Sequence, residues 1–536
     1  MTIEERLQNL ELEDLVGQTL CYDIYDRDDP KEIEEILKKI RPGGIFLTRM
    51  SQEKIKMYTD MANKYTKLPV IVAADVENGP ATIVEDSVFI PHQMAWGACD
   101  DADLLKKAGR ATAKICRKNG VHWTFSPIID INYNFRNPES NIRSVSDDPK
   151  QVVKMTKAMM EGMQENGYMV TACKHFPGQG MDERNSHFLT TSNPMTQEEW
   201  MNTYGWVYKQ MIEAGAPSIM VGHGGLECFE KEIDPLFGAL PAVLSKSLMT
   251  DLLKGILGFD GCLVSDAMSM IGVASRVNDL AEIGVKFLKA GGDVILFPEP
   301  TDFDNVLQAV KSGELPMERL KDAVLRMLRL KERVRLFEEQ SKINAEIGDV
   351  TDMEEIAQEI ADKSIKVVRD YNHVIPTKLE KGSKILMLNM LEPHFHKPPT
   401  GKELSAMKQA FEERGYIVDE IYTAKHKQVQ EIMNNYDMIC LNCKMSSQDY
   451  NGASMRVNWN NIMVLWRGYV LQHKRFVFTS FGDPYKLFDF PYLKEYVNAF
   501  SFTDASQRAV VKVILGEIEA QGKNPVRLEG FFEREV

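Results

Sequence analysis

The chain has 536 residues, of which 44% are hydrophobic and 26% are charged, the composition of an ordinary globular protein. This length exceeds what one ordinary hydrophobic core requires, so we expect two large domains and no extensive disorder. The formal net charge of −14 is spread along the sequence, and an anionic surface repels nucleic-acid backbones and acidic membrane surfaces. We therefore expect neither nucleic acid nor a membrane as a partner.

Export and metal-binding signals are also lacking in the sequence. Residues 1–15 alternate charged residues with Leu, without the apolar core of a secretory signal, and no later run is apolar over a membrane's thickness. The eight cysteines are scattered through apolar segments, as is typical of reduced thiols. Cys440 and Cys443 have ligand-like spacing but lack the further ligands that zinc requires. We predict a cytoplasmic protein without a metal or another cofactor.

Short apolar runs alternate with amphipathic stretches up to about residue 340. This pattern favours parallel strands joined by helices. Eight such runs occur, which is the number of strands in a (β/α)₈ or TIM barrel. They span residues 17–23, 43–48, 69–75, 121–127, 168–175, 218–223, 261–266 and 292–297.

The predicted fold class is therefore α/β, with the barrel over residues 1–345. Residues 346–380 are expected to form a linker and a connecting helix. Residues 381–536 should form a smaller, doubly wound α/β layered domain, because a second alternation begins there. Its strand-like runs lie at 384–390, 438–443 and 475–482.

Polar residues end several runs of the predicted barrel. Catalytic groups of such barrels lie where the strands end, so we expect these side chains to line an active site. A segment with one Pro and two Gly residues follows the fifth run, which indicates a shaped loop in a catalytic position. The residues at the run ends are Asp75, Lys174, His175, His223 and Asp266.

Four segments of the sequence resemble motifs of glycoside hydrolase family 3, specifically its β-N-acetylglucosaminidase branch. Residues 174–187, KHFPGQGMDERNSH, are similar to the family's Lys-His-Phe-Pro-Gly-x-Gly…Asp-Ser-His signature. Residues 75–79 resemble its Asp-x-Glu-x-Gly motif, residues 141–144 its Arg-Ser segment, and residues 264–270 its Ser-Asp-x nucleophile motif. The motifs follow one another in the family's order.

This resemblance implies a retaining mechanism in which Asp266 is the nucleophile and His187 is the general acid and base. Donors at the strand end would keep the pKa of Asp266 low, so that its carboxylate is ionised. The resemblance implies sugar-binding roles for Asp75, Arg143, Lys174 and His175, and His223 is placed by its strand end to join them. The expected partner is a carbohydrate, bound by a monomer or homodimer.

One residue departs from the family pattern beside the predicted acid/base. Asn185 stands where the family has an aspartate that orients the histidine. An amide can orient the ring but cannot stabilise an imidazolium, which weakens a general acid unless Asp182 or Glu183 supplies the charge. We therefore predict a β-N-acetylhexosaminidase. A β-glycosidase or glycoside phosphorylase of other sugar specificity, or a weakened sugar-binding protein, remains an alternative.

Overall fold

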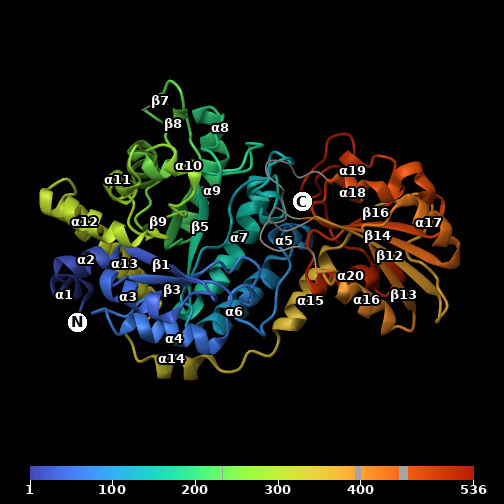
Figure 1. Cartoon of the computed structure of the whole chain (residues 1–536), viewed down its shortest axis with the longest axis horizontal. Coiled ribbons are helices and arrows are strands. Elements are labelled where there is room, and N and C mark those ends of the chain that lie inside the picture. The colour runs from blue at the N-terminus through green and yellow to red at the C-terminus, as the bar shows by residue number, and fades with distance from the viewer. Residues whose placement is uncertain (232, 393–399, 446–456) are drawn as a thin grey trace. The chain divides into compact units, whose positions relative to one another are not determined.

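The computed structural model describes the chain apart from short internal segments and divides it into two compact units (Figure 1). Each unit combines segments that are separated in the sequence, and each is described by itself. No helix among the described residues is long and apolar enough to cross a membrane. The described residues are 1–231, 233–392, 400–445 and 457–536. Unit 1 consists of 1–88, 105–130 and 156–353, and unit 2 of 89–104, 131–155 and 354–536.

Unit 1 is built on an eight-stranded parallel sheet in the order β10-β1-β2-β3-β4-β5-β6-β9. A parallel bridge between Val264 and Val294 joins the two ends of this order, so the sheet is a nearly closed barrel. All eight predicted runs are strands, which confirms the predicted barrel. The strands are β1 (Leu20–Ile24), β2 (Gly44–Leu47), β3 (Ile71–Ala74), β4 (Trp123–Thr124), β5 (Val170–Phe176), β6 (Ser218–Val221), β9 (Cys262–Ser265) and β10 (Ile295–Leu296).

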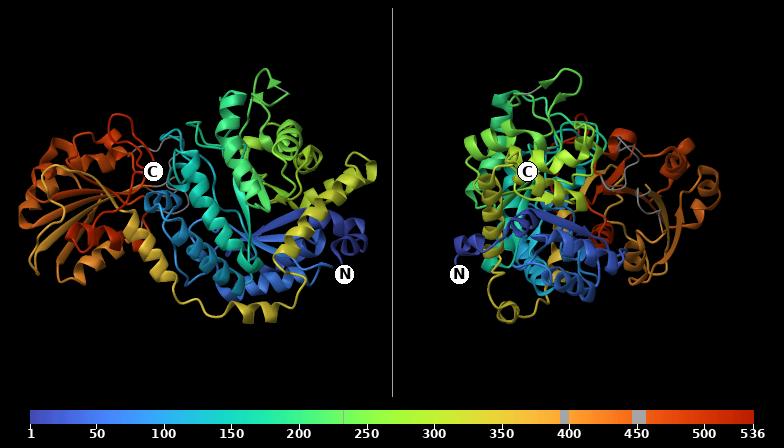
Figure 2. Two further views of the ribbon diagram at one scale, coloured as in Figure 1. Left: turned by 180° about the vertical axis from the view of Figure 1, so that it is seen from behind. Right: turned by 60° about the vertical axis from the view of Figure 1, so that its left-hand side comes forward.

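Helices surround the barrel strands, which Figures 1 and 2 show from three sides. Because both faces of each strand are covered, every residue of β2, β3, β5, β6 and β9 is buried, and the strands read as continuous apolar runs. The helices include α3 (Pro30–Ile40), α4 (Gln52–Asn63), α6 (Ala102–Lys118), α7 (Pro149–Gln164), α9 (Tyr204–Glu213), α11 (Ile283–Ala290), α12 (Pro300–Ser312) and α13 (Met317–Arg333).

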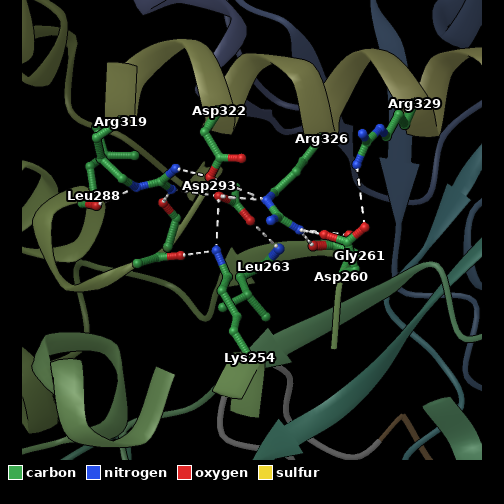
Figure 3. Close-up of polar contacts among 12 residues, drawn as sticks. Lys254, Asp260, Gly261, Leu263, Leu288, Asp293, Arg319, Asp322, Arg326 and Arg329 are labelled. Carbon is green, nitrogen blue, oxygen red and sulfur yellow. Dashed lines mark hydrogen bonds and ion pairs between the residues drawn. The ribbon is translucent and has the colours of Figure 1, made fainter. Parts of the chain in front are cut away.

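A buried carboxylate fastens the seam where the barrel closes (Figure 3). Asp293 is fully buried just before β10 and accepts a hydrogen bond of 2.8 Å from the amide of Leu263 on β9. Its Oδ1 lies 2.5 Å from Nη2 of Arg319 on α13 and 3.4 Å from Nζ of Lys254. A buried charge must be paired, so this carboxylate ties both closing strands to α13.

Unit 2 contains a six-stranded sheet in the order β11-β16-β15-β14-β12-β13, in which only the pairing of β11 with β16 is antiparallel. Figure 1 shows α16 and α20 on one face of this sheet. The strands are β11 (Lys366–Asp370), β12 (Lys384–Leu391), β13 (Ile417–Tyr422), β14 (Met438–Met445), β15 (Phe476–Gly482) and β16 (Glu495–Asn498). The helices include α5 (Gln93–Cys99), α15 (Met353–Ser364), α16 (Ser405–Glu412), α17 (His426–Ile432) and α20 (Asp504–Leu515).

The second sheet confirms the predicted α/β layers and adds three strands that the sequence did not suggest. β12, β14 and β15 are the predicted runs, and they form the buried centre of the sheet. β11 and β13 are edge strands with partly exposed residues, so their apolar signal is weak. β11 lies inside the range expected to be a linker, and unit 2 also includes two segments from before residue 156.

A lysine is completely buried in unit 1. Lys331 on α13 has no exposed surface, and its Nζ donates a hydrogen bond of 2.7 Å to Oε1 of Gln18. Burial disfavours the ammonium form and lowers the pKa of Lys331 to about 7, against a small opposing effect of Cys21. The folded protein therefore binds this proton much more weakly than the unfolded chain does.

We predict that Lys331→Met raises the free energy of unfolding, most strongly at pH 7 and below. Between pH 7 and about 10 the unfolded chain holds a proton that the folded state lacks, so the wild type gains roughly 1 kcal/mol of stability per pH unit at this site. The methionine variant lacks this gain. Urea denaturation of both proteins at several pH values should therefore give converging stabilities as pH rises. A difference in unfolding free energy that stays the same at every pH would contradict the lowered pKa of Lys331.

Candidate active site

Asp266 follows β9 directly, at the carboxyl end of the barrel, and its side chain is half-buried. Its Oδ1 accepts a hydrogen bond of 2.7 Å from the amide of Ala267. Burial alone would raise the pKa of Asp266, but the imidazoles of His223 and His175, the Ala267 amide and Lys174 outweigh it and lower the pKa to about 2. The carboxylate is thus ionised at neutral pH, as an attacking carboxylate requires.

Lys174 is buried within β5 and is held by two carboxylates of the segment that follows β3. Its Nζ lies 2.7 Å from Oδ1 of Asp75 and 2.7 Å from Oε1 of Glu77. Glu77 is buried, whereas the Asp75 side chain is 49% exposed. The buried Glu77 carboxylate balances the charge of the buried Lys174 ammonium. Lys174 also orients the Asp75 carboxylate, which is exposed and keeps lone pairs available for a ligand.

His175 is positioned by Asp130, a residue that sequence reasoning missed. Asp130 is 1% exposed, and its Oδ2 lies 2.7 Å from Nδ1 of His175. Its Oδ1 accepts hydrogen bonds from the backbone amides of His175, at 3.2 Å, and Gln179, at 2.8 Å. A carboxylate only accepts, so Nδ1 carries the proton and Nε2 is the ring nitrogen that remains for a ligand.

Aromatic side chains fix the turn that follows His175. The Tyr204 hydroxyl donates a hydrogen bond of 2.6 Å to the Gln179 carbonyl, and Nε1 of Trp200 donates one of 3.0 Å to the Pro177 carbonyl. Gly178 has φ +109°, and a β-carbon there would overlap the Tyr204 ring. This position therefore requires glycine on both conformational and steric grounds.

His187 lies farther along the same loop, is exposed, and is oriented by Asn185. Oδ1 of Asn185 accepts a hydrogen bond of 3.0 Å from the amide of His187 and lies 2.7 Å from its Nδ1. Since the oxygen that accepts from the backbone amide can only accept from the ring as well, Nδ1 is protonated. The amide thus selects the tautomer that an aspartate would select, although without its negative charge.

The remaining predicted residues fall into two groups. His223 is fully buried after β6, and its Nε2 lies 2.9 Å from the carbonyl oxygen of Ala267, which places it beside Asp266. Arg143 belongs to unit 2, where its Nη1 donates a hydrogen bond of 3.3 Å to the Glu139 carbonyl. The structure brings five of the predicted residues together in unit 1, namely Asp75, Lys174, His175, His223 and Asp266. The role of Arg143 stays a prediction.

Glu77 and Asp130 complete the polar network but were not among the predicted site residues. Glu77 lies within the Asp-x-Glu motif, so its type and position were visible in the sequence. Asp130 follows the fourth predicted run by three residues, in a stretch of alternating apolar and polar residues. A carboxylate placed soon after a barrel strand was the signal available for it.

A family model for the N-terminal domain of glycosyl hydrolase family 3 matches residues 2–330 of the chain. The chain belongs to glycoside hydrolase family 3. Membership accounts for the barrel and for the order of its strand-end motifs, and it makes the protein a glycoside hydrolase.

Similarity to individual proteins extends over both units. A β-N-acetylglucosaminidase/β-glucosidase of Cellulomonas fimi is 28% identical over 527 residues, which cover 95% of this chain and 93% of that protein. A β-hexosaminidase of Nitrosospira multiformis is 28% identical over 295 residues, 52% of this chain and 80% of that protein. The structure of β-glucoside phosphorylase BglX is similar with a TM-score of 0.87 and 27% identity, covering 98% and 96% of the two chains.

We predict that Asp130→Asn lowers kcat/KM by about 10- to 100-fold, the effect of losing one charge-assisted hydrogen bond. If the asparagine oxygen continues to accept the two backbone amides, its NH₂ group faces Nδ1 of His175 and favours the wrong tautomer. Steady-state kinetics measures the loss, and thermal denaturation reports whether the fold is retained. Unchanged kinetics in a folded variant would show that the orientation of His175 is unimportant for turnover.

Proposed function

We propose that the protein is a retaining β-N-acetylhexosaminidase that releases terminal N-acetylglucosamine from oligosaccharides or cell-wall fragments in the cytoplasm. The observation that carries this proposal is the ionised carboxylate of Asp266 among His223, His175 and Lys174. The similarity to a β-N-acetylglucosaminidase/β-glucosidase along nearly the whole chain supports the choice of sugar.

In the proposed first step, Asp266 attacks the anomeric carbon and forms a glycosyl-enzyme ester while the glycosidic bond breaks. His187 donates a proton to the departing oxygen, so that the leaving group departs as an alcohol. In the second step His187 removes a proton from water, which attacks the anomeric carbon and releases Asp266 as a carboxylate. The product keeps the β configuration.

The polar network around Lys174 and His175 fits the binding of sugar hydroxyls. Asp75 offers carboxylate oxygens, while Lys174 and Nε2 of His175 offer polar groups at the same end of the barrel. Such contacts accelerate the reaction when they strengthen as the ring approaches an oxocarbenium ion. The buried partners Glu77 and Asp130 keep these groups in place, which limits the reorganisation needed during turnover.

A second candidate function is phosphorolysis, in which phosphate replaces water in the second step. Asn185 favours it, because a neutral amide beside His187 repels an anionic acceptor less than an aspartate would. Nδ2 of Asn185 is buried and has no hydrogen-bond partner among the described residues, so a donor is available there. The similarity to a β-glucoside phosphorylase structure points the same way.

Turnover of aryl β-N-acetylglucosaminide, β-glucoside and β-xyloside, each with and without phosphate, tests the proposal. We expect the N-acetylglucosaminide to be the best substrate, with the free β-anomer of the sugar as first product in both conditions. Asp266→Ala should lower kcat by about 10⁴-fold or more, as the loss of an essential nucleophile does. Activity that survives this substitution would overturn the nucleophile assignment.

Two further outcomes separate the alternatives. Sugar 1-phosphate that forms only with phosphate would identify a phosphorylase and overturn the hydrolase. The variant Asn185→Asp restores a negative charge beside His187, so a hydrolase should gain about 10-fold in kcat/KM for a poor leaving group, the effect typical of a partner that orients a functional histidine. A phosphorylase should instead lose phosphate-dependent turnover. Sugar binding without turnover in both proteins would identify a binding protein.

A further inference from the structure

The segment after Asp266 packs directly against the loop that carries His187. Helix α10 (Ile271–Ala274) begins soon after Asp266, and its Gly272 lies against the backbone of Ser186 and Leu189. A β-carbon on Gly272 would overlap the Ser186 carbonyl oxygen and would lie 2.8 Å from that of Leu189. The two backbones are therefore closer than any residue other than glycine allows.

A hydrogen bond reinforces this contact on the other side of His187. The hydroxyl of Thr190 donates a hydrogen bond of 2.8 Å to the carbonyl oxygen of Gly272. Within the loop, the amide of Phe188 donates one of 3.0 Å to the Asn185 carbonyl, which closes a turn around His187. The contacts to α10 thus lie on both sides of His187 in the sequence, at Ser186 before it and at Leu189 and Thr190 after it.

The loop has a further attachment after this turn. The amide of Gly225, after β6, donates a hydrogen bond of 2.8 Å to the Thr191 carbonyl, and the amide of Asn193 donates one of 3.1 Å to the Gly225 carbonyl. The loop is thus tied both to the segment after β6 and to α10. The tie to α10 links the loop directly to the segment that follows Asp266.

We propose that Gly272 and Thr190 are positioning residues that set the location of His187 relative to Asp266. The inference rests on the proposed function, in which Asp266 is the nucleophile and His187 is the acid/base. The groups of a retaining glycosidase must lie about 5–5.5 Å apart in the usual two-carboxylate geometry, and misplacement by about 1 Å can cost up to 10²-fold in rate. A contact between the loop of His187 and the nucleophile's own segment sets this separation directly.

Helix propensity alone predicts the opposite effect of a substitution at Gly272. Alanine is a better helix former than glycine, by up to about 1 kcal/mol in a helix interior, so Gly272→Ala would not weaken the short helix α10 if nothing lay against it. The new methyl group must instead push residues 186–189 away. Because the substitution itself does not weaken α10, a loss of activity in Gly272→Ala reports the contact between Gly272 and the loop of His187.

Four variants isolate the contact. Gly272→Ala displaces the loop, and Thr190→Val removes the donor but keeps the shape of the side chain. Thr190→Ser keeps the hydroxyl and serves as the conservative rescue. Gly109→Ala is the matched control, because a β-carbon on Gly109 in α6 would overlap the Met159 carbonyl oxygen within a helix pair away from the loop.

The measurement is kcat/KM for a series of aryl β-N-acetylglucosaminides whose phenols differ in acidity, because kcat/KM reports the step that breaks the glycosidic bond. A dinitrophenolate leaves without a proton, whereas phenolate needs the general acid. We expect Gly272→Ala to lose about 10²-fold on the phenyl substrate and Thr190→Val about 5-fold. Both variants should lose less than about 2-fold in kcat/KM on the dinitrophenyl substrate. In Thr190→Ser and Gly109→Ala, kcat/KM should depend on the acidity of the leaving phenol as it does in the wild type.

His187→Ala separates failure of the inference from failure of the proposed function. If His187→Ala loses activity selectively on the phenyl substrate, but Thr190→Val and Gly272→Ala show the wild-type dependence or an equal loss on all substrates, only the inference is overturned. If His187→Ala itself loses activity equally on all substrates, the acid role of His187 fails and the inference fails with it. Thr190→Val keeps the test decisive if Gly272→Ala does not fold.

Discussion

The ionised carboxylate of Asp266 in a half-buried position is the constraint on which the rest of unit 1 depends. Burial favours its protonated form, and His223, His175, Lys174 and the Ala267 amide reverse that preference. These groups come from three neighbouring strands, β5, β6 and β9, so the charge balance exists only while the strands keep their places. The buried Asp293 helps to keep them, because it ties the closing strands to α13.

The polar groups around Asp266 are fixed by partners of their own. Lys174 lies between Asp75 and Glu77, and His175 is held by Asp130, which leaves one defined ring nitrogen of His175 for a ligand. His187 differs, because it is exposed on a loop and its partner is an uncharged amide. In the proposed mechanism, charged pairs thus hold the groups that bind the sugar, whereas proton transfer depends on how the loop is placed.

The barrel was predictable because its strands are buried on both faces and therefore appear as apolar runs of strand length. The polar residues at the run ends were visible in the sequence for a related reason, since polar residues that interrupt such runs stand out, and their roles in the site stay predictions. The residues of the edge strand β11 are partly exposed, so β11 does not appear in the sequence as an apolar run. Asp130 and Gly272 act through contacts with residues 45 or more positions away, and single-sequence patterns carry no information on such pairs. The grouping of residues 89–104 and 131–155 with unit 2 is likewise a long-range property.

Trapping a covalent glycosyl-enzyme is the decisive test of Asp266 as the nucleophile. An aryl β-glycoside with a fluorine on the sugar ring and an activated leaving group forms the glycosyl-enzyme but hydrolyses slowly, because fluorine destabilises the oxocarbenium-like transition state. Mass spectrometry of the intact protein and of its peptides then locates the added sugar. We expect one sugar per chain, attached to Asp266. A label on another residue, or complete turnover to the inverted anomer without any adduct, would contradict it.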